Sequence, residues 1–184
     1  MKFRKIIVAA LAVAGLSAGV FAEVRPNAIG LRSGGGSLFG AEVNYQRAMG
    51  QKNRLELGGR YSSWGNYRSL LLGRTGTRYA SFGAVGFYQW HFSMAPGIAN
   101  NGFNWYAGPG GGIGMTTWET YLYGEKLRNG GDLYVDIGGQ VGVEYDFNVA
   151  KYPFNVSLDM RPLIGALNDF DFGYDISFAV RWTF

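Results

Sequence analysis

The chain has 184 residues, enough for one domain of ordinary size, and it contains no cysteine, which excludes disulfides and thiol chemistry. The formal net charge of +4 depends on Lys2, Arg4 and Lys5 near the start; without them 14 basic side chains face 13 acidic ones, so charge gives no support for nucleic-acid binding. Glycine is abundant at 30 residues, aromatic residues make up 16% and charged residues only 16%. This composition is typical of sheets whose strands bend sharply and whose outer surface meets apolar surroundings.

Residues 1–22 have the pattern of a secretory signal peptide. A basic start is followed by an apolar run over residues 6–20, and Val20-Phe21-Ala22 places small residues where signal peptidase requires them. The apolar run is too short for a membrane-spanning helix. We therefore predict cleavage after Ala22, leaving a single domain over residues 23–184.

The remaining sequence alternates between apolar and polar residues with a period of two, which indicates strands with two different faces. Residues 133–146 are the clearest case: Val135 and Ile137 share one face, whereas Asp136 and Glu144 share the other. Eight such strands are predicted, over residues 28–34, 38–46, 54–62, 77–92, 101–118, 133–146, 154–161 and 174–184.

Two environments produce such alternation: a soluble sandwich with its polar face in water, or a membrane barrel with its polar face in the lumen. The predicted strands often run to ten or more residues, which suits a bilayer crossing better than a soluble sheet. Aromatic residues lie near the ends of the segments, as in the two interfacial girdles of a membrane barrel. We therefore predict an all-β fold, an eight-stranded antiparallel transmembrane β-barrel.

The inward face of this barrel is predicted to hold a balanced set of charges. An eight-stranded barrel is just wide enough for side chains to fill it, and arginine can bridge carboxylates in pairs, so we expect a hydrogen-bonded plug instead of a channel. The predicted lumen network comprises Arg32, Glu42, Arg54, Glu56, Arg60, Asp136, Glu144, Asp159, Arg161, Asp175 and Arg181.

The connections are predicted to be short at one end of the barrel and long at the other. Segments 49–53 and 147–152 are the short ones, and segments 65–76, 119–131 and 165–173 are the long, external ones. The external loop near residues 34–36 is unusually short, and the link over residues 93–100 is unusually long for its end.

The last strand carries the clearest family resemblance. Its apolar face alternates with polar residues and ends on an aromatic residue, through Phe178, Val180, Trp182 and Phe184. Together with the signal and the eight strands, this ending resembles the small bacterial outer-membrane barrels of the OmpX, OmpW and OmpA-transmembrane-domain type. The resemblance implies location in the outer membrane and insertion by the barrel-assembly machinery, which reads that strand.

Candidate chemistry is sparse. The spacing of His91 and Ser93 resembles the catalytic pair of PagL-type lipid A deacylases, but the pair falls at the periplasmic end and lacks an orienting carboxylate; His91 is expected to be an interfacial residue. A single histidine excludes multi-histidine metal sites. The glycine-rich segment 108–114 lacks the Lys-Ser/Thr of a phosphate loop and indicates a place where bulk is excluded. We predict no enzyme activity, no metal and no cofactor.

The expected role is structural, adhesive or that of an accessory subunit. Expected partners are outer-membrane lipid and lipopolysaccharide, the assembly machinery during insertion and a larger outer-membrane complex, but not nucleic acid. Leu70, Leu71 and Leu72, in a predicted external loop, form a candidate contact for a partner or a simple packed loop tip. The alternative roles are a narrow pore or lateral path for small hydrophobic molecules, as in OmpW, and, less favoured, a lipid A-modifying enzyme.

Overall fold

The computed structural model describes residues 26–34, 40–50, 52–70, 73–94, 102–167 and 172–184. The predicted signal, residues 1–22, lies outside the described residues, as do residues 35–36 of the short external loop, residues 38–39 of the second predicted strand and most of the link over residues 93–100. No described helix is long and apolar enough to cross a membrane.

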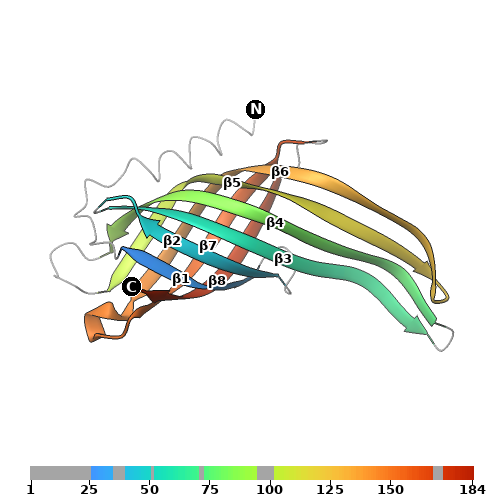
Figure 1. Cartoon of the computed structure of the whole chain (residues 1–184), viewed down its shortest axis with the longest axis horizontal. Coiled ribbons are helices and arrows are strands. Elements are labelled where there is room, and N and C mark those ends of the chain that lie inside the picture. The colour runs from blue at the N-terminus through green and yellow to red at the C-terminus, as the bar shows by residue number, and fades with distance from the viewer. Residues whose placement is uncertain (1–25, 35–39, 51, 71–72, 95–101, 168–171) are drawn as a thin grey trace.

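Eight antiparallel strands form one closed ring in sequence order, which confirms the predicted fold class (Figure 1). The ring closes where the first strand pairs with the last, from Ala28 opposite Thr183 to Gly34 opposite Ser177. The strands are β1 (Asn27–Gly34), β2 (Ala41–Ala48), β3 (Asn53–Leu70), β4 (Gly73–Ser93), β5 (Phe103–Leu122), β6 (Glu125–Asp146), β7 (Phe154–Gly165) and β8 (Phe172–Thr183).

The barrel has its apolar side chains outside and its charges inside. Leu31 is 67% exposed and Leu133 64%, whereas Glu56 and Arg161 are fully buried. In water this arrangement would expose a broad apolar surface, whereas in a bilayer it is the stable one, because acyl chains cover the outer face and the closed ring satisfies the backbone. The inverted polarity is therefore that of a transmembrane barrel.

The strands differ greatly in length, and four of them extend beyond the rest of the barrel (Figure 1). Strands β3 to β6 have 18 to 22 residues, whereas β1 and β2 have 8 and β7 and β8 have 12. Beyond Tyr61, which still pairs with β2, and Asp136, which still pairs with β7, the strands β3–β6 continue as a four-stranded sheet. It comprises residues 62–70, 73–81, 116–122 and 125–132 and lies at the hairpin end of the barrel, opposite the terminus end where Asn27 and Phe184 pair. We call this part the projecting sheet.

The projecting sheet corrects two predicted loops. Segments 65–76 and 119–131 were expected to be long connections, but both continue as paired strands almost to their tips. Threonine and tyrosine, which favour strands, occur in both segments, as Tyr67 and Thr75 in the first and Thr120 and Tyr121 in the second. In the second hairpin, Tyr123 and Gly124 form a two-residue turn with φ of 51° and 91°, the left-handed pair that joins antiparallel strands tightly.

Two connections at the terminus end, segments 49–53 and 147–152, are short, as predicted. Met49 donates a backbone hydrogen bond to Asn53, and the segment after β6 forms a 3₁₀ helix, η1 (Phe147–Ala150). The Asp146 side chain caps this helix by accepting from the Asn148 backbone N–H at 2.9 Å. These turns keep the strands of the terminus end in fixed register beneath the lumen.

Glycine allows the strands of the wall to approach closely. A Cβ atom at Gly108 would lie 1.7 Å from the Tyr88 carbonyl oxygen, and one at Gly110 would lie 2.3 Å from the Gly86 carbonyl oxygen. The glycine-rich segment 108–114 therefore leaves room for β4 against β5, the exclusion of bulk that its sequence indicates.

Candidate functional site

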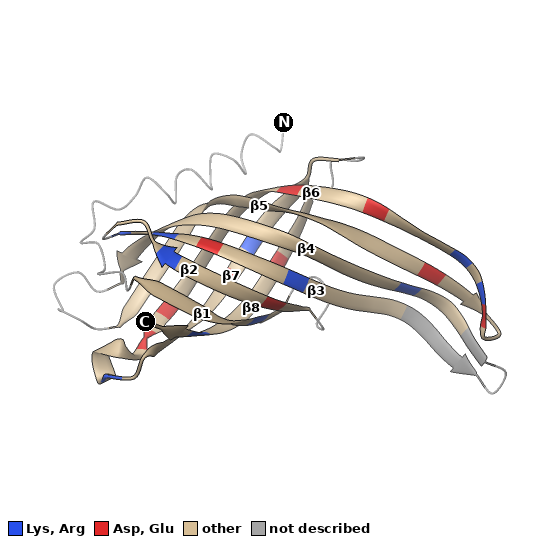
Figure 2. Cartoon of the chain, viewed as in Figure 1, with Lys and Arg blue, Asp and Glu red and all other residues tan. Residues whose placement is uncertain are grey.

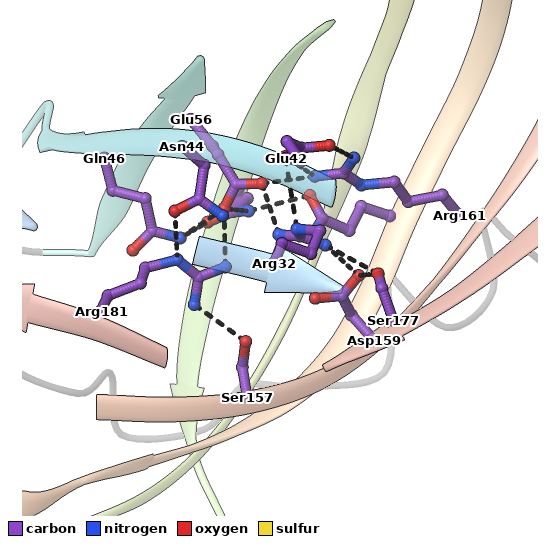
Figure 3. A network of polar contacts seen from close by, with 12 residues as sticks. Arg32, Glu42, Asn44, Gln46, Glu56, Ser157, Asp159, Arg161, Ser177 and Arg181 are labelled. Carbon is purple, nitrogen blue, oxygen red and sulfur yellow. Dashed lines mark hydrogen bonds and ion pairs between the residues drawn. The ribbon is translucent and has the colours of Figure 1, made fainter. Parts of the chain in front are cut away.

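The centre of the lumen is a glutamate bound by three arginines (Figure 3). Glu56 on β3 accepts a hydrogen bond at 2.6 Å from Arg32 on β1 and at 2.6 Å from Arg161 on β7. Its second oxygen accepts from Arg181 on β8 at 3.0 Å and from Gln46 at 2.6 Å. Because these strands lie on different sides of the ring, one side chain joins the walls across the lumen.

Two further carboxylates complete the arginine contacts. The two terminal nitrogens of Arg161, Nη1 and Nη2, donate to the two carboxylate oxygens of Glu42 at 2.7 and 3.1 Å. This is the planar, bidentate geometry in which guanidinium and carboxylate groups pair. Arg32 pairs with Asp159, which also accepts from the Tyr106 hydroxyl at 2.8 Å. The same arginine lies 3.3 Å from Glu42.

A second cluster lies toward the terminus end. Arg54 contacts Glu144 at 3.2 Å, and Arg181 lies 4.0 Å from the same carboxylate. The described interior network thus joins four arginines to four carboxylates, Arg32, Arg54, Arg161 and Arg181 with Glu42, Glu56, Glu144 and Asp159. Buried charges are costly unless paired, and here each of these eight has an opposite charge within 4 Å.

Neutral side chains fill the space between the charges. Phe87 is 1% exposed and lies under the Arg161 guanidinium, 4.4 Å from ring centroid to Cζ. Tyr106 is fully buried, and Gln89 donates to Gln140 at 2.9 Å. Phe87 and Tyr106 were not predicted from the sequence, because β4 and β5 carry aromatic residues on both faces. Extending the alternation from Gln89 along β4 would have placed Phe87 inside.

His91 belongs to the lumen, so its prediction as an interfacial residue is wrong. It is 1% exposed, stacks on Tyr106 with centroids 5.0 Å apart, and has Nε2 3.2 Å from the Gln89 side-chain oxygen. Odd-numbered residues of β4 point inward, and His91 shares that parity with Phe87 and Gln89. Ser93 is the last residue of β4 and is only half-buried.

Three residues predicted for the lumen network lie outside it. Arg60, Asp136 and Asp175 are half-buried and line a cavity of about 730 Å³ at the hairpin end, whose floor includes Arg32 and Glu42. The Arg60 guanidinium lies 5.5 Å from the Tyr134 ring centroid. These residues lie nearer the hairpin end than the charges of the network, so inward alternation there points into the cavity.

Charged residues of both signs recur along the strands of the barrel and reach the projecting sheet (Figure 2). On the exposed sheet, Lys126 donates to Glu119 at 2.5 Å and the Tyr121 hydroxyl donates to Glu119 at 2.8 Å. These two hydrogen bonds, that of Lys126 foremost, hold the pKa of the Glu119 carboxyl below its usual value of 4.5.

The predicted assembly face of β8 is outward. Phe178, Val180, Trp182 and Phe184 are 44 to 58% exposed, while the residues between them point into the lumen. In the predicted partner loop, Leu71 and Leu72 lie outside the described residues; Leu70 ends β3, and its side chain is not described.

No family model and no curated protein matches the chain. Among solved structures, Neisserial surface protein A is 16% identical, with a TM-score of 0.49 over 86% of this chain and 95% of the other. Ail of Yersinia pestis is 10% identical, with a TM-score of 0.45 over 89% and 100%, and the N-terminal β-barrel domain of Pseudomonas aeruginosa OprF is 12% identical, with a TM-score of 0.42 over 88% and 100%.

The architecture is that of an eight-stranded transmembrane β-barrel. The assignment rests on this chain's own closed ring of eight antiparallel strands and on its inverted polarity. The fold is shared by barrels with different tasks, so function has to be argued from the lumen and the hairpin end.

Proposed function

We propose that this chain is an integral barrel of a bacterial outer membrane, exported with residues 1–22 as a cleaved signal, with a sealed lumen and a structural, adhesive or accessory-subunit role. The observation that supports it best is the interior network. An eight-stranded barrel leaves little interior space, and here Arg32, Arg161 and Arg181 converge on Glu56 and occupy the centre. With the lumen sealed, the projecting sheet at the hairpin end is the part of the barrel available for contact with partners.

In this proposal the terminus end lies in the periplasm and the projecting sheet lies outside the cell. Acyl chains of lipid and lipopolysaccharide cover the apolar outer face. The assembly machinery recognises the outward face of β8, from Phe178 to Phe184, during insertion. The projecting sheet is the surface available to a larger outer-membrane complex or to an external partner.

The orientation is tested by labelling introduced cysteines, because the natural chain has none. Leu127 is exposed near the tip of the second long hairpin, and Val149 is exposed at the terminus end. A membrane-impermeant maleimide should label Leu127→Cys in intact cells and Val149→Cys only after lysis. The proposal is contradicted if Val149→Cys is the variant labelled in intact cells and Leu127→Cys is not. It is also contradicted if neither variant is labelled after lysis although the protein is folded.

The sealed lumen is tested by conductance of the purified protein in planar bilayers. A sealed barrel adds no ohmic current, whereas the alternative, a narrow pore, gives current that grows with the amount inserted. Heat-dependent gel mobility confirms that the inserted protein is folded. Steady current from folded parent protein, changed in Arg161→Ala, would establish the pore instead.

The absence of catalysis is also a proposal. The described contacts of His91 are with Gln89 and Tyr106 in the lumen, on the periplasmic side of the proposed orientation. Expression of the chain should leave the mass of lipid A unchanged. A mass change that disappears in Ser93→Ala would establish the lipid A-modifying alternative.

A further inference from the structure

An aromatic row crosses the face of the projecting sheet that continues the lumen. Trp64 on β3 pairs with Tyr79 on β4, and Tyr79 pairs with Trp118 on β5. The Trp64 and Tyr79 rings stack, with centroids 5.4 Å apart and planes 10° from parallel. The Trp118 indole lies over Gly130 on β6, since a Cβ there would be 2.6 Å from its Cζ2. The row therefore runs across the sheet from β3 to β6, with the Trp64 and Tyr79 rings stacked on each other.

Hydroxyl groups border this row on both sides. Toward the barrel, Thr116 donates to Ser81 at 3.2 Å; toward the tips, the hydroxyls of Thr77 and Thr120 lie 3.1 Å apart. Each hydroxyl can donate one hydrogen bond and accept others, so these pairs retain capacity for a ligand.

The aromatic row meets the cavity at Trp64. This tryptophan is 41% exposed and lines the cavity together with Ser62, Ser81 and Thr116. At about 730 Å³ the cavity falls within the range of roughly 300–1,000 Å³ for small-molecule sites. Its opposite side includes the half-buried Asp136 and Asp175, so aromatic and carboxylate groups face one space.

Two buried oxygens in this cavity have no hydrogen-bond partner among the described residues, the Tyr134 hydroxyl and Asp175 Oδ1. Tyr134 lies across two glycines: a Cβ at Gly83 or at Gly114 would be 2.3 Å from its hydroxyl. The glycines thus let the Tyr134 side chain lie along the cavity wall. An unpaired buried polar group is costly, and a ligand hydroxyl would supply the missing bond to either oxygen.

The lining distinguishes between ligand classes. A strongly anionic ligand would meet Asp136 and Asp175 as well as Arg60, and Arg32 is already bound to carboxylates. A purely apolar ligand would leave the carboxylates and the Tyr134 hydroxyl unpaired. A sugar ring fits both parts, because its C–H face packs on an aromatic ring while its hydroxyls donate to carboxylates and to tyrosine.

We propose that the cavity and the aromatic row form a binding site for an uncharged saccharide. One ring lies against Trp64 with its hydroxyls toward Tyr134, Asp136 and Asp175, and further units continue over Tyr79 and Trp118. The inference rests on the proposed function, because it requires the hairpin end to face the exterior. Two sources supply such a saccharide: lipopolysaccharide of the same envelope, or a glycan of another cell.

The test uses the full chain folded in an amine-oxide detergent, because glycoside detergents would compete for the site. Fluorescently tagged protein is applied to an array of neutral, sialylated and sulfated glycans. A neutral O-polysaccharide released from lipopolysaccharide is titrated separately by tryptophan fluorescence. We expect saturable binding to neutral glycans or to the O-polysaccharide, and which of the two arms binds identifies the source.

Two variants locate the binding. Trp64→Ala and Asp136→Asn should each weaken it at least tenfold, whereas Leu133→Ala, a matched truncation on the opposite face of β6, should leave it unchanged. No binding in any arm, binding that survives Trp64→Ala and Asp136→Asn, or binding confined to sulfated or sialylated glycans would overturn the inference. Labelling of Leu127→Cys in intact cells shows separately whether the proposed function holds, so the two failures are distinguishable.

Discussion

Asn27 and Phe184 close the barrel through a reciprocal pair of backbone hydrogen bonds: the Asn27 N–H donates to the Phe184 carbonyl at 3.0 Å, and the Phe184 N–H donates to the Asn27 carbonyl at 2.9 Å. The pair lies where β1 meets β8, the contact that converts an eight-stranded sheet into a ring. Closure removes both sheet edges, which a bilayer does not tolerate. The Phe184 side chain faces outward and takes no part in these bonds.

Backbone and side chain at Phe184 can therefore be separated by mutation. Phe184→Pro removes the N–H and should lower the free energy of unfolding by about 1 kcal/mol relative to Phe184→Ala, which keeps it. Denaturant titration in lipid vesicles measures the difference. Hydrogen exchange of the Asn27 amide reports whether the hydrogen bonds between Asn27 and Phe184 are intact. Equal stability of the two variants would show that this hydrogen bond adds nothing to the free energy of unfolding.

Phe184→Ala should reduce insertion of the barrel in cells and leave refolding into vesicles intact, because the assembly machinery is proposed to recognise the aromatic ring.

Glu56→Gln should destabilise the barrel by about 3–5 kcal/mol, because three arginines would lose their shared carboxylate in a buried setting. Urea unfolding followed by tryptophan fluorescence measures it. Glu125→Gln is the matched control: Glu125 is exposed at the second hairpin, and its variant should stay within about 0.5 kcal/mol of the parent. If the Glu56→Gln protein is as stable as the Glu125→Gln control, the network does not hold the walls of the barrel together.

Gly108→Ala should cost about 1–3 kcal/mol, because the added methyl group would lie against the Tyr88 carbonyl and push β5 from β4. Gly59→Ala makes the same chemical change at a strand position where nothing lies within 4 Å of the new Cβ. Unfolding midpoints of the two variants provide the comparison. A Gly108→Ala barrel no less stable than Gly59→Ala would refute the close approach of the two strands.

The Glu119 carboxyl should titrate with a midpoint below 4.5, because Lys126 and Tyr121 donate hydrogen bonds to its charged form. A lowered pKa means that the interaction is complete above 4.5 and is lost as the pH falls through the lower midpoint. Carbon NMR of the glutamate carboxyls in micelles follows it. Lys126→Gln should raise the midpoint toward 4.5, and an unchanged midpoint would show that the pair does not form in solution.

The period-two pattern predicted two-faced strands, and strand length together with aromatic residues at the strand ends selected a membrane barrel over a soluble sandwich. The same alternation predicted that Glu56 and the arginines face the lumen, but it did not predict which of them form pairs. The alternation could not show at which residues the closed ring of strands ends. Arg60, Asp136 and Asp175 alternate as the deeper charges do, and only the unequal strand lengths reveal that they line a cavity.

The projecting sheet was hidden for a different reason. Residues near Tyr79 and Trp118 were interpreted as a membrane girdle, because aromatic residues mark the ends of bilayer-crossing strands. Strand propensity continued through those positions, but turn residues such as glycine and asparagine suggested loops. The pairing of Trp64 with Tyr79 is a contact between hairpin arms, and such contacts become visible only when the register is known.

Because the interior network joins equal numbers of guanidinium and carboxylate groups, its formal charges sum to zero. An electric field does work only on the net charge that a movement carries along it. Moving this network as one rigid body along the membrane normal carries no net charge, so a transmembrane voltage does no work on that motion.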